Sequence, residues 1–295
     1  MTISNRLFHL AWPIIRPIVP ADIRYHFRHA RIRREFHNYT RNKFGAHHSH
    51  YSSGPLAPAE LITTEALMSE RDLPAKVRPD WYFSTGYGDA LQILTTLEQH
   101  SFDLANLRSV LEFGCGTARV LRHFRNIESL SLAGSDANPK AIEWDRRNLP
   151  GIDFRINALE PPLPFAEETF DLVYALSVFT HIPLAWQRRW LEELRRVLRP
   201  EGYLLCTVLG SSFVNQMLTA QDQAILEQTG ALTLDSNHPR ASYSTQVLGS
   251  WDVFQTRDRV REAFGAVFRI CDYTNVPVGQ DMLVLRRDSA DQMCK

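Results

Sequence analysis

The sequence predicts an α/β fold that is doubly wound around a mostly parallel seven-stranded sheet, in which the last strand is antiparallel. Three observations support this prediction. From about residue 87 onward, short apolar segments alternate with segments of helical periodicity. A glycine turn joins the first apolar segment to a helix, and the last two apolar segments are separated only by a turn. Alternating strands and helices are typical of βαβ units, whose strands lie parallel.

The apolar segments give the strands in order. Five parallel strands are expected at 110–113, 130–134, 152–156, 170–176 and 203–208, and two further strands at 266–272 and 282–286. Helices are expected at 89–100, 119–124 and 185–198. The last is the clearest, because Trp186, Trp190 and Leu194 fall on one helical face and Pro200 follows its end. The turn between the last two strands allows them to pair antiparallel.

The chain divides into an extension and a main domain. Residues 1–80 are predicted to form a basic helical extension, with a helix at 21–43 and a His-, Ser- and Gly-rich linker at 45–58. Residues 81–295 form the main domain, with an insertion at about 211–265 that covers one end of the sheet. Within the insertion we expect a helical piece at 213–228 and an irregular loop at 229–250.

Composition excludes collagen, coiled coil and wholesale disorder, because 44% of the 295 residues are apolar and 22% are charged. The formal net charge is zero, yet residues 1–50 hold nine Lys and Arg against two acidic residues. Such a basic arm suits a nucleic acid, an anionic lipid surface or an acidic partner. The apolar stretch 7–20 is broken by Arg16 and three prolines, so it is either packed on the protein or in peripheral contact with a membrane.

Cysteine and histidine usage is also informative. The four cysteines form no CxxC pair, which favours free thiols and a cytoplasmic location. No apolar run reaches the ~18 residues that a membrane span requires. His47, His48 and His50 have no cysteine or carboxylate beside them, so a solvated loop is favoured over a metal site and no metal is expected.

The strongest local signal is the glycine turn after the first strand. Gly114 and Gly116 allow a sharp bend that brings backbone N–H groups close to a ligand. The pattern G-x-G-x-x-Arg lacks the last glycine of a dinucleotide fingerprint. Asp136 lies 22 residues after Gly114, at the end of the second strand. A carboxylate there can accept both hydroxyls of a ribose, although a helix cap before Asn138-Pro139 is an alternative role.

These residues together resemble class I S-adenosylmethionine-dependent methyltransferases, which have a Rossmann-like fold. The resemblance covers roughly 85–290 and depends on five features in order: Glu112 with the Gly114/Gly116 turn, Asp136, Asn157-Ala158, Phe170–Val173 and Leu198–Tyr203. Ala118 and Glu201 stand where many members have glycine. Residues 81–86, 161–165 and 174–181 and the ending Gly279-Gln280-Asp281 resemble a narrower bacterial group, which looks like small-molecule or glycan methyltransferases.

The resemblance implies a cofactor, S-adenosylmethionine, and a role for each matching residue. The turn of Glu112, Gly114, Cys115 and Gly116 would face the amino-acid end of the cofactor, with Glu112 either reaching its ammonium or orienting the loop. Asp136 would bind the ribose and Ala137 would pack on the adenine. Asn157 and Ala158 would flank the adenine edge, and Leu176 and Ser177 would line the methionine arm. Ser84, Thr85 and Gly86, with Tyr82 nearby, would close over the cofactor; helix capping and core packing are the alternative for these four.

His181 is the best candidate for a general base that removes the acceptor's proton. It follows the fourth strand closely, and the ordinary pKa of histidine suits proton transfer at neutral pH. Its alternative role is to cap or orient the next helix. Tyr243 and Tyr273 are weaker candidates, and Ser242, Ser244 and Trp251 of the insertion could contact an acceptor. Methylases of DNA amino groups usually carry Asp/Asn-Pro-Pro-aromatic after the fourth strand, whereas residues 176–179 read Leu-Ser-Val-Phe.

The preferred interpretation is therefore a methyltransferase that acts on an O or N atom of a small molecule or glycan. An RNA methyltransferase that uses the basic arm is one alternative. A non-catalytic scaffold that keeps the cofactor fold is another. A nicotinamide oxidoreductase is less favoured, because the last glycine is missing and Glu112 has no role beside a pyrophosphate.

Overall fold

The computed structural model describes residues 21–45, 54–58, 61–62, 79–241, 251–274 and 279–289. Its central feature is a seven-stranded sheet in the order β3-β2-β1-β4-β5-β9-β8. Strand β9 is antiparallel to both of its neighbours, and the other neighbouring strands pair parallel. The strands are β1 Ser109–Phe113, β2 Ser131–Asp136, β3 Ile152–Ile156, β4 Phe170–Ala175, β5 Leu198–Val208, β8 Arg269–Thr274 and β9 Asp281–Arg286. The predicted fold class and its antiparallel last strand are confirmed.

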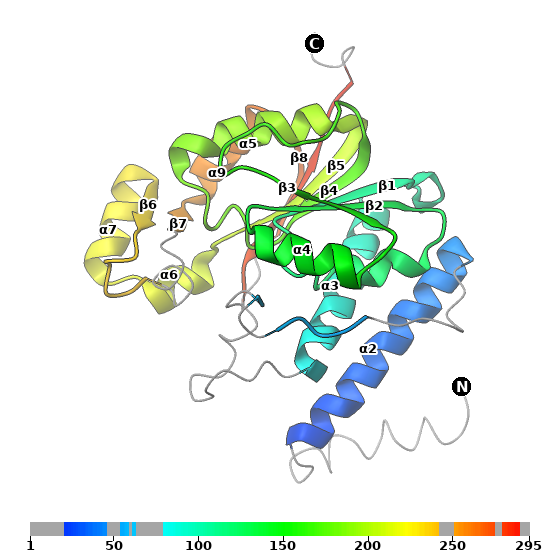
Figure 1. The fold of residues 1–295 in the computed structure, drawn as a ribbon. Coiled ribbons are helices and arrows are strands. Elements are labelled where there is room, and N and C mark those ends of the chain that lie inside the picture. Colours follow the sequence, from blue (N-terminus) through cyan, green and yellow to red (C-terminus); the bar gives the residue numbers. More distant parts are fainter. Residues whose placement is uncertain are drawn as a thin grey trace.

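Helices cover both faces of the sheet (Figure 1). One face packs against α3 (Pro79–Gln99), η4 (Leu121–Asn126) and α4 (Pro139–Asn148). The other packs against α5 (Leu184–Val197) and α9 (Arg257–Gly265). Side chains alternate between the faces along each strand, so that Val110 and Leu111 of β1 enter different core layers. This double covering explains why the strands read as nearly continuous apolar runs.

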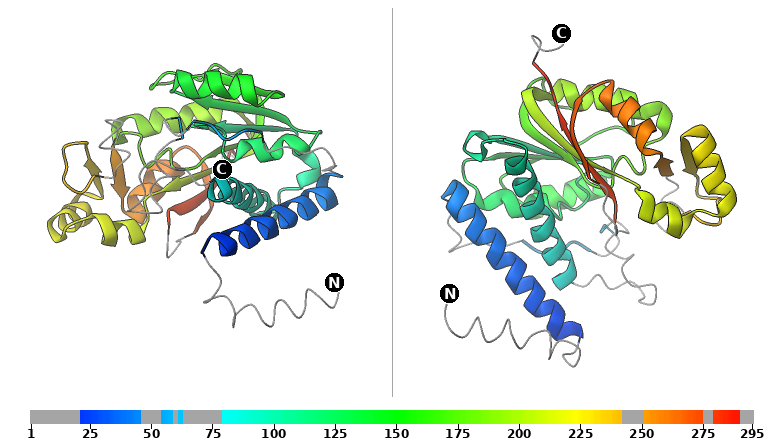
Figure 2. Two further views of the ribbon diagram at one scale, coloured as in Figure 1. Left: turned by 60° about the horizontal axis from the view of Figure 1, so that its bottom comes forward. Right: turned by 180° about the vertical axis from the view of Figure 1, so that it is seen from behind.

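The basic helix of the extension lies outside these layers. Helix α2 (Ala21–Phe44) runs alongside α3, as both views of Figure 2 show. Phe36 of α2 is fully buried against Tyr87 of α3, with ring centroids 5.5 Å apart. Tyr39 and Lys43 donate hydrogen bonds to Glu98 near the C-terminal end of α3. The predicted helix at 21–43 is thus confirmed, and α3 begins ten residues earlier than the predicted start at 89.

The helix predicted at 119–124 is instead a short 3₁₀ helix, η4. A regular α-helix after the glycine turn would use the Leu121 N–H to bond the carbonyl of Thr117. Here Leu121 donates to Oε2 of Glu112 at 3.1 Å. Ala118 has φ of +51°, which also interrupts helical geometry. The buried carboxyl group of β1 therefore decides the local structure after the turn.

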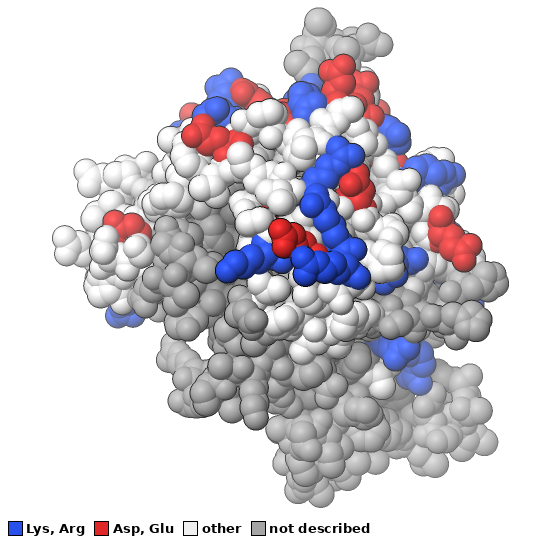
Figure 3. Space-filling model, viewed as in Figure 1, with Lys and Arg blue, Asp and Glu red and all other residues white. Residues whose placement is uncertain are grey.

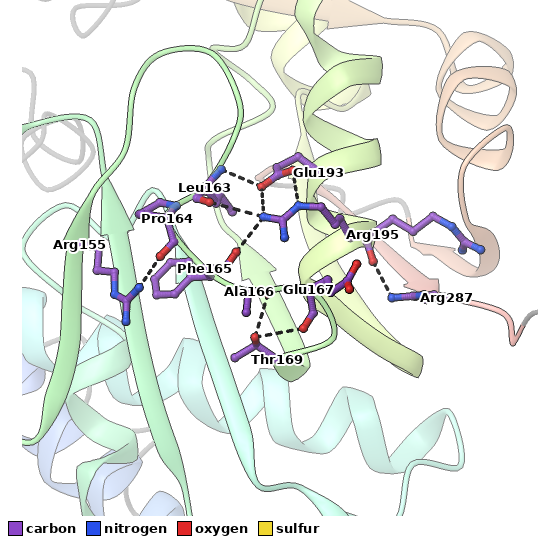
Figure 4. A network of polar contacts seen from close by, with 11 residues as sticks. Arg155, Leu163, Pro164, Phe165, Ala166, Glu167, Thr169, Glu193, Arg195 and Arg287 are labelled. Atoms are coloured by element: carbon purple, nitrogen blue, oxygen red, sulfur yellow. Dashed lines mark hydrogen bonds and ion pairs between the residues drawn. The ribbon is translucent and has the colours of Figure 1, made fainter.

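The loop between β3 and β4 is held against α5 by polar contacts (Figure 4). Oε1 of Glu193 accepts the N–H of Leu163 at 2.7 Å, and Arg196 donates to the carbonyl of Phe165 at 2.9 Å. Trp190 of α5 donates to the carbonyl of Leu159 at 3.2 Å. These bonds fix the chain just after Asn157 and Ala158, two of the residues expected to contact the cofactor.

The insertion forms a small lobe at one end of the sheet (Figure 1). It consists of α6 (Ser211–Met217), α7 (Ala220–Thr229), β6 (Ala231–Leu234) and β7 (Asp252–Gln255), with β6 and β7 paired antiparallel. The single helix predicted at 213–228 is two helices, because Thr219 forms a capping box with Asp222. Strand β6 lies in the predicted irregular loop. Helix α9 was not predicted; it ends the insertion and packs in the main core through Val260 and Phe264.

The described helices include none with both the length and the apolar character needed to cross a lipid bilayer.

Gly86 marks the closest approach between α3 and the segment after the glycine turn. A Cβ at this position would stand 2.2 Å from the carbonyl oxygen of Arg119, a backbone atom that cannot move aside alone. Gly86→Ala is expected to destabilise the protein by about 2 kcal/mol or more, in the range of overpacked cores. Chemical denaturation measures this difference.

Gly88 provides a matched control in the same helix. A Cβ there meets nothing within 4 Å. Gly88→Ala should therefore raise stability by roughly 0.5–1 kcal/mol, since alanine is the better helix former. Equal effects at the two positions would show that the contact with Arg119 is not a constraint.

Candidate active site

The glycine turn lies where β1 ends, between β2 and β4. The N–H groups of Gly114 and Cys115 both donate to the carbonyl of Ser135 on β2, at 2.8 and 3.0 Å. Gly114 has φ of +73°, and a Cβ there would stand 2.4 Å from Cγ2 of Val178. Gly116 has φ of +52°. The turn therefore requires glycine at Gly114 both for its backbone angle and for the space beside the loop that follows β4.

Asp136 joins this turn directly. Its Oδ2 accepts the N–H of Gly116 at 2.8 Å, and its Oδ1 accepts the N–H of Asn138 at the same distance. Burial raises the pKa of Asp136, while these backbone bonds oppose the increase. Each oxygen keeps a lone pair for another donor. The helix cap belongs to Asn138, whose side chain accepts from Lys140 and Ala141. Capping therefore does not occupy Asp136, and its contact with a ribose stays a prediction.

Asn157 stands beside Asp136 at the end of β3, with its N–H bonded to the Asp136 carbonyl at 3.1 Å. Its side chain is 8% exposed, and its Oδ1 is buried without a hydrogen-bond partner among the described residues. A buried amide oxygen without a donor is costly in a folded protein. Ala137 and Ala158 are exposed on either side. The sequence-predicted pair of Asp136 and Asn157 is thus brought together.

These residues fit the nucleoside part of S-adenosylmethionine. Asp136 offers acceptor positions for ribose hydroxyls, and the orphaned oxygen of Asn157 offers one for an amino group such as that of adenine. Ile156 and Leu159 are exposed large apolar side chains next to Asn157, with exposed fractions of 41% and 68%. An aromatic base that covered them would remove apolar surface from water.

Glu112 is buried beneath the turn. It is 5% exposed, and its Oε2 accepts the N–H of Leu121. Burial raises the pKa of Glu112 to about 8, against the opposing charge of Arg119. The sequence left two roles open for Glu112, contact with the cofactor's ammonium group or orientation of the loop. Its position favours the second role, because the carboxyl group bonds the loop's own backbone. The side chain of Cys115 points into the core, where burial raises the pKa of its thiol. Cys115 therefore contributes its backbone, and not its sulfur, to the ligand side of the turn.

Ser177 lies just after β4 in a polar network. Its N–H donates to Oγ1 of Thr207 at 2.7 Å, and the Thr207 hydroxyl donates to Oε1 of Gln280 at 2.6 Å. The Ser177 hydroxyl bonds to the same amide oxygen at 2.9 Å. Ser177 has φ of +58°, which this network stabilises. Leu176 is half-buried against the core layer of α3. The ends of β4, β5 and β9 are therefore tied together at one point.

His181 lies between the loop after β4 and the insertion. Its Nδ1 is 2.7 Å from the carbonyl oxygen of Trp251 and 3.8 Å from Oδ1 of Asp252. A carbonyl oxygen only accepts, so Nδ1 carries the proton and Nε2 keeps its lone pair in the neutral ring. The N–H of Val253 bonds to the carbonyl of Thr180 at 2.8 Å, which holds β7 beside this loop. The side chain of His181 is 30% exposed, as proton exchange with a ligand requires.

The predicted closing residues on α3 have other local contacts. The hydroxyl of Thr85 bonds within the helix to the carbonyl of Tyr82 at 3.2 Å, and Gly86 packs on Arg119 and His123. The Tyr82 hydroxyl instead reaches the turn, where it donates to the carbonyl of Thr117 at 3.0 Å. Contact of Thr85 and Gly86 with the cofactor stays a prediction. Among the weaker candidates, Tyr273 is buried in the layer of α5 and α9, and residues 242–250, with Ser242, Tyr243 and Ser244, lie outside the described residues.

Two buried ionisable residues near the turn were not predicted as site residues. Arg122 and Asp145 are both fully buried. Burial raises the pKa of Asp145 to about 8, and the charge of Arg122 opposes this increase. A signal for Asp145 exists in the sequence, because it lies on the same helical stripe as Ala141, Ile142 and Leu149. Arg122 stands within the apolar run of Val120 to Phe124, which is a comparable signal.

The chain resembles known methyltransferases over its central part. Residues 111–206 match the model of a family described as a methyltransferase domain. A phthiotriol/phenolphthiotriol dimycocerosates methyltransferase of Mycobacterium ulcerans is 38% identical over 108 residues, which is 36% of this chain and 39% of the relative. A methyltransferase of Streptomyces halstedii is 25% identical over 145 residues, 46% of this chain and 51% of the relative. The chain thus spans about two fifths to half of these curated relatives.

A solved structure of a protein from Pyrococcus horikoshii is similar with a TM-score of 0.49 and 15% identity, covering 69% of this chain and 91% of that one.

The buried carboxyl group of Glu112 predicts a pH dependence of stability. The unfolded chain ionises this group above about 4.5, whereas the folded protein holds its proton up to about pH 8. The contribution of this group to stability is therefore fully present below pH 4.5 and is lost as pH rises toward 8. The loss from this group at pH 7 is on the order of 3 kcal/mol. Glu112→Gln should flatten the decline in unfolding free energy between pH 5 and 8, measured by urea denaturation.

Glu227→Gln removes an exposed carboxylate of α7 and controls for the change in net charge. If both variants keep the wild-type slope, Glu112 does not carry the pH dependence.

Proposed function

We propose that this chain, whose residues 111–206 form a methyltransferase domain of the class I, S-adenosylmethionine-dependent kind, transfers a methyl group to an O or N atom of a small molecule or glycan. The bound cofactor supplies a methyl group made electrophilic by its sulfonium. The residues of this chain hold the nucleoside, align the acceptor and accept its proton. Alignment is the largest of these tasks, because a fixed near-attack geometry can contribute about 7–11 kcal/mol to lowering a barrier.

One observation carries the proposal. The bond from Gly116 to Asp136 couples the glycine turn to the carboxylate at the end of β2, and the partnerless Oδ1 of Asn157 lies next along the same edge. Together they offer acceptors for two parts of one nucleoside, at the carboxyl ends of parallel strands where ligands of open α/β sheets bind. A nicotinamide dinucleotide would have its pyrophosphate on this turn. The N–H groups of Gly114, Cys115 and Gly116 already bond within the protein, which leaves this turn fewer donors for a diphosphate.

His181 is proposed as the general base. The Trp251 carbonyl fixes the tautomer in which Nε2 accepts a proton, and Asp252 stabilises the imidazolium that forms. The loop that carries His181 also places Val178 against Gly114 of the turn. The base and the cofactor turn are thus packed on one loop, which suits a proton transfer close to the methyl group.

The surroundings of His181 favour an acceptor with apolar or sugar surface. Trp186 of α5 and Trp251 are both half-buried, and their rings meet edge to face with centroids 6.2 Å apart. Tryptophan rings suit apolar bodies and sugar rings that also carry polar groups. The Mycobacterium relatives are named for dimycocerosate acceptors, which supports a small-molecule acceptor here. On the face of the molecule shown in Figure 3, basic and acidic side chains adjoin one another. Ion pairs such as Arg147–Glu143 neutralise part of the positive charge that binding to RNA phosphates would need.

A cytoplasmic location is part of the proposal. Cys115, Cys206 and Cys271 have free thiols, which suit a reducing compartment.

Binding and metabolite measurements test the assignment. Calorimetry should detect S-adenosylhomocysteine binding and no NADH binding. Comparison of metabolites between a deletion strain and its parent should reveal a compound that lacks a 14-dalton increment. Binding of NADH without S-adenosylhomocysteine would replace the proposed function with an oxidoreductase, and salt-dependent RNA binding lost on removal of residues 1–50 would favour the RNA alternative.

Asp136 is the residue on which cofactor affinity depends most. Asp136→Ala removes a charged acceptor for ribose, and S-adenosylhomocysteine should bind about 10- to 100-fold more weakly. Asp153→Ala, at an exposed site on the neighbouring strand β3, should leave the affinity unchanged. Isothermal calorimetry measures both dissociation constants, and thermal unfolding checks that each variant is folded. Equal affinity in the two variants contradicts the ribose role.

His181 should separate rate from affinity. His181→Ala is expected to lower kcat by about 100-fold or more, with S-adenosylhomocysteine affinity within twofold of wild type. His238→Ala is the matched control, because His238 belongs to the insertion lobe and also faces a carboxylate, Asp222, at 3.6 Å. A near-normal rate for His181→Ala, once the acceptor is known, would remove it as the base.

A further inference from the structure

We propose that Arg122 is a positioning residue that couples the chain segment 54–58 to the cofactor turn, so that cofactor binding and the docking of this segment favour each other. The inference rests on the proposed function, since it concerns the same turn. It gives the linker of the N-terminal extension a role in cofactor binding.

The guanidinium of Arg122 is fully buried, and it bonds both the segment 54–58 and the chain just after the glycine turn. Its Nη1 donates to the carbonyl of Pro55 at 2.8 Å. On the other side, its Nη2 donates to the carbonyl of Thr117 at 2.7 Å, and its Nε donates to the carbonyl of Ala118 at 2.9 Å. One planar group therefore spans the segment and the two residues that follow Gly116. The fixed fork of arginine suits several acceptors at once, which a lysine cannot match.

The carbonyl of Thr117 depends on these donors. In a continuous helix it would accept from Leu121, but the Leu121 N–H is taken by Glu112. Arg122 and the Tyr82 hydroxyl satisfy the carbonyl instead. A buried carbonyl without a donor would be costly, so these two side chains fix the peptide between Thr117 and Ala118. The N–H of Gly116, which bonds Asp136, lies two peptide groups earlier in the same turn.

The segment 54–58 rests on the same group of side chains. Ala57 and Ile62 are buried together with Tyr82, and Leu56, Phe83 and Trp144 pack against them. The guanidinium of Arg122 stands 5.2 Å from the ring centroid of Tyr82 and 5.6 Å from that of Trp144. A desolvated guanidinium over aromatic faces is favourable, and loss of its carbonyl partners would leave a buried charge unsatisfied.

Reciprocity follows from this arrangement. If docking of the segment stabilises the turn geometry that binds cofactor, then cofactor binding must stabilise the docked segment by the same free energy. Tyr82 of α3 participates in both contacts, because its hydroxyl is 3.3 Å from Nη2 of Arg122 and bonds Thr117. The observable consequence is that cofactor binding should slow hydrogen exchange in the segment 54–58, which has no predicted cofactor contact of its own.

Hydrogen exchange followed by mass spectrometry tests the coupling on the full chain, with S-adenosylhomocysteine as the probe. In the wild-type protein, the probe should slow exchange in peptides covering 114–118 and also in peptides covering 54–58. In Arg122→Lys, protection of 114–118 should remain at saturating probe, while added protection of 54–58 should be lost. Calorimetry should show affinity weaker by about 5-fold or more, the lower range of coupling between sites.

Arg125→Lys is the matched control, because Arg125 is a half-buried arginine of the same 3₁₀ helix, and it should behave as wild type. If Arg122→Lys does not fold, Tyr82→Phe removes one bond to Thr117 and keeps the ring, and it should reduce the protection of 54–58 in part. Unchanged protection of 54–58 in wild type with bound probe overturns the coupling alone. Absence of probe binding to wild type overturns the proposed function and the coupling with it.

Discussion

The hydrogen bond from the Gly116 N–H to Asp136 is the interaction on which the site depends. It joins the turn after β1 to the end of β2, and it sets the carboxylate beside the turn instead of leaving it to solvent. The bond exists because Gly114 and Gly116 adopt positive φ, and because the carbonyl of Ser135 receives the N–H groups of Gly114 and Cys115. Without this geometry, the acceptors of Asp136 and Asn157 would not face one ligand.

Three buried ionisable residues, Glu112, Asp145 and Arg122, lie near the turn. Glu112 and Asp145 have pKa values raised to about 8 by burial, so near neutral pH they are largely uncharged. A protonated Glu112 still accepts the Leu121 N–H through one oxygen. The guanidinium of Arg122 donates to three backbone carbonyls. Glu112 and Arg122 thus fix the backbone that follows the turn, while the buried carboxyl group of Glu112 lowers stability at neutral pH.

The sequence predicts the sheet well, and it also predicts that Gly116, Asp136 and Asn157 come together, because both patterns are local. Strands such as β1 and β4 are short apolar runs, and the spacing of Gly114 and Asp136 reflects one βαβ unit. The prediction is wrong for the helix at 119–124, because a distant carboxyl group from β1 takes the N–H that an α-helix needs. The local pattern around Arg122 indicates burial, but it does not predict the contacts with Pro55 and Tyr82, which lie 67 and 40 residues away in sequence. The pairing of His181 with Trp251 spans 70 residues and is hidden for the same reason.

The acceptor half of the site is assembled differently from the cofactor half. The cofactor half comes from strand ends that neighbour each other in one sheet, so its geometry follows from the fold. The proposed acceptor half needs the insertion, because Trp251, the residue before β7, supplies the carbonyl that fixes the tautomer of His181. Strand β7 is held by the Thr180 carbonyl and by the bridge between Leu209 and Phe254. These two contacts anchor β7 to the core, and with it the carbonyl of Trp251 that bonds His181. The family match covers 111–206, so Trp251 and the rest of the lobe lie outside the matched region, and the proposed acceptor contacts lie there with them.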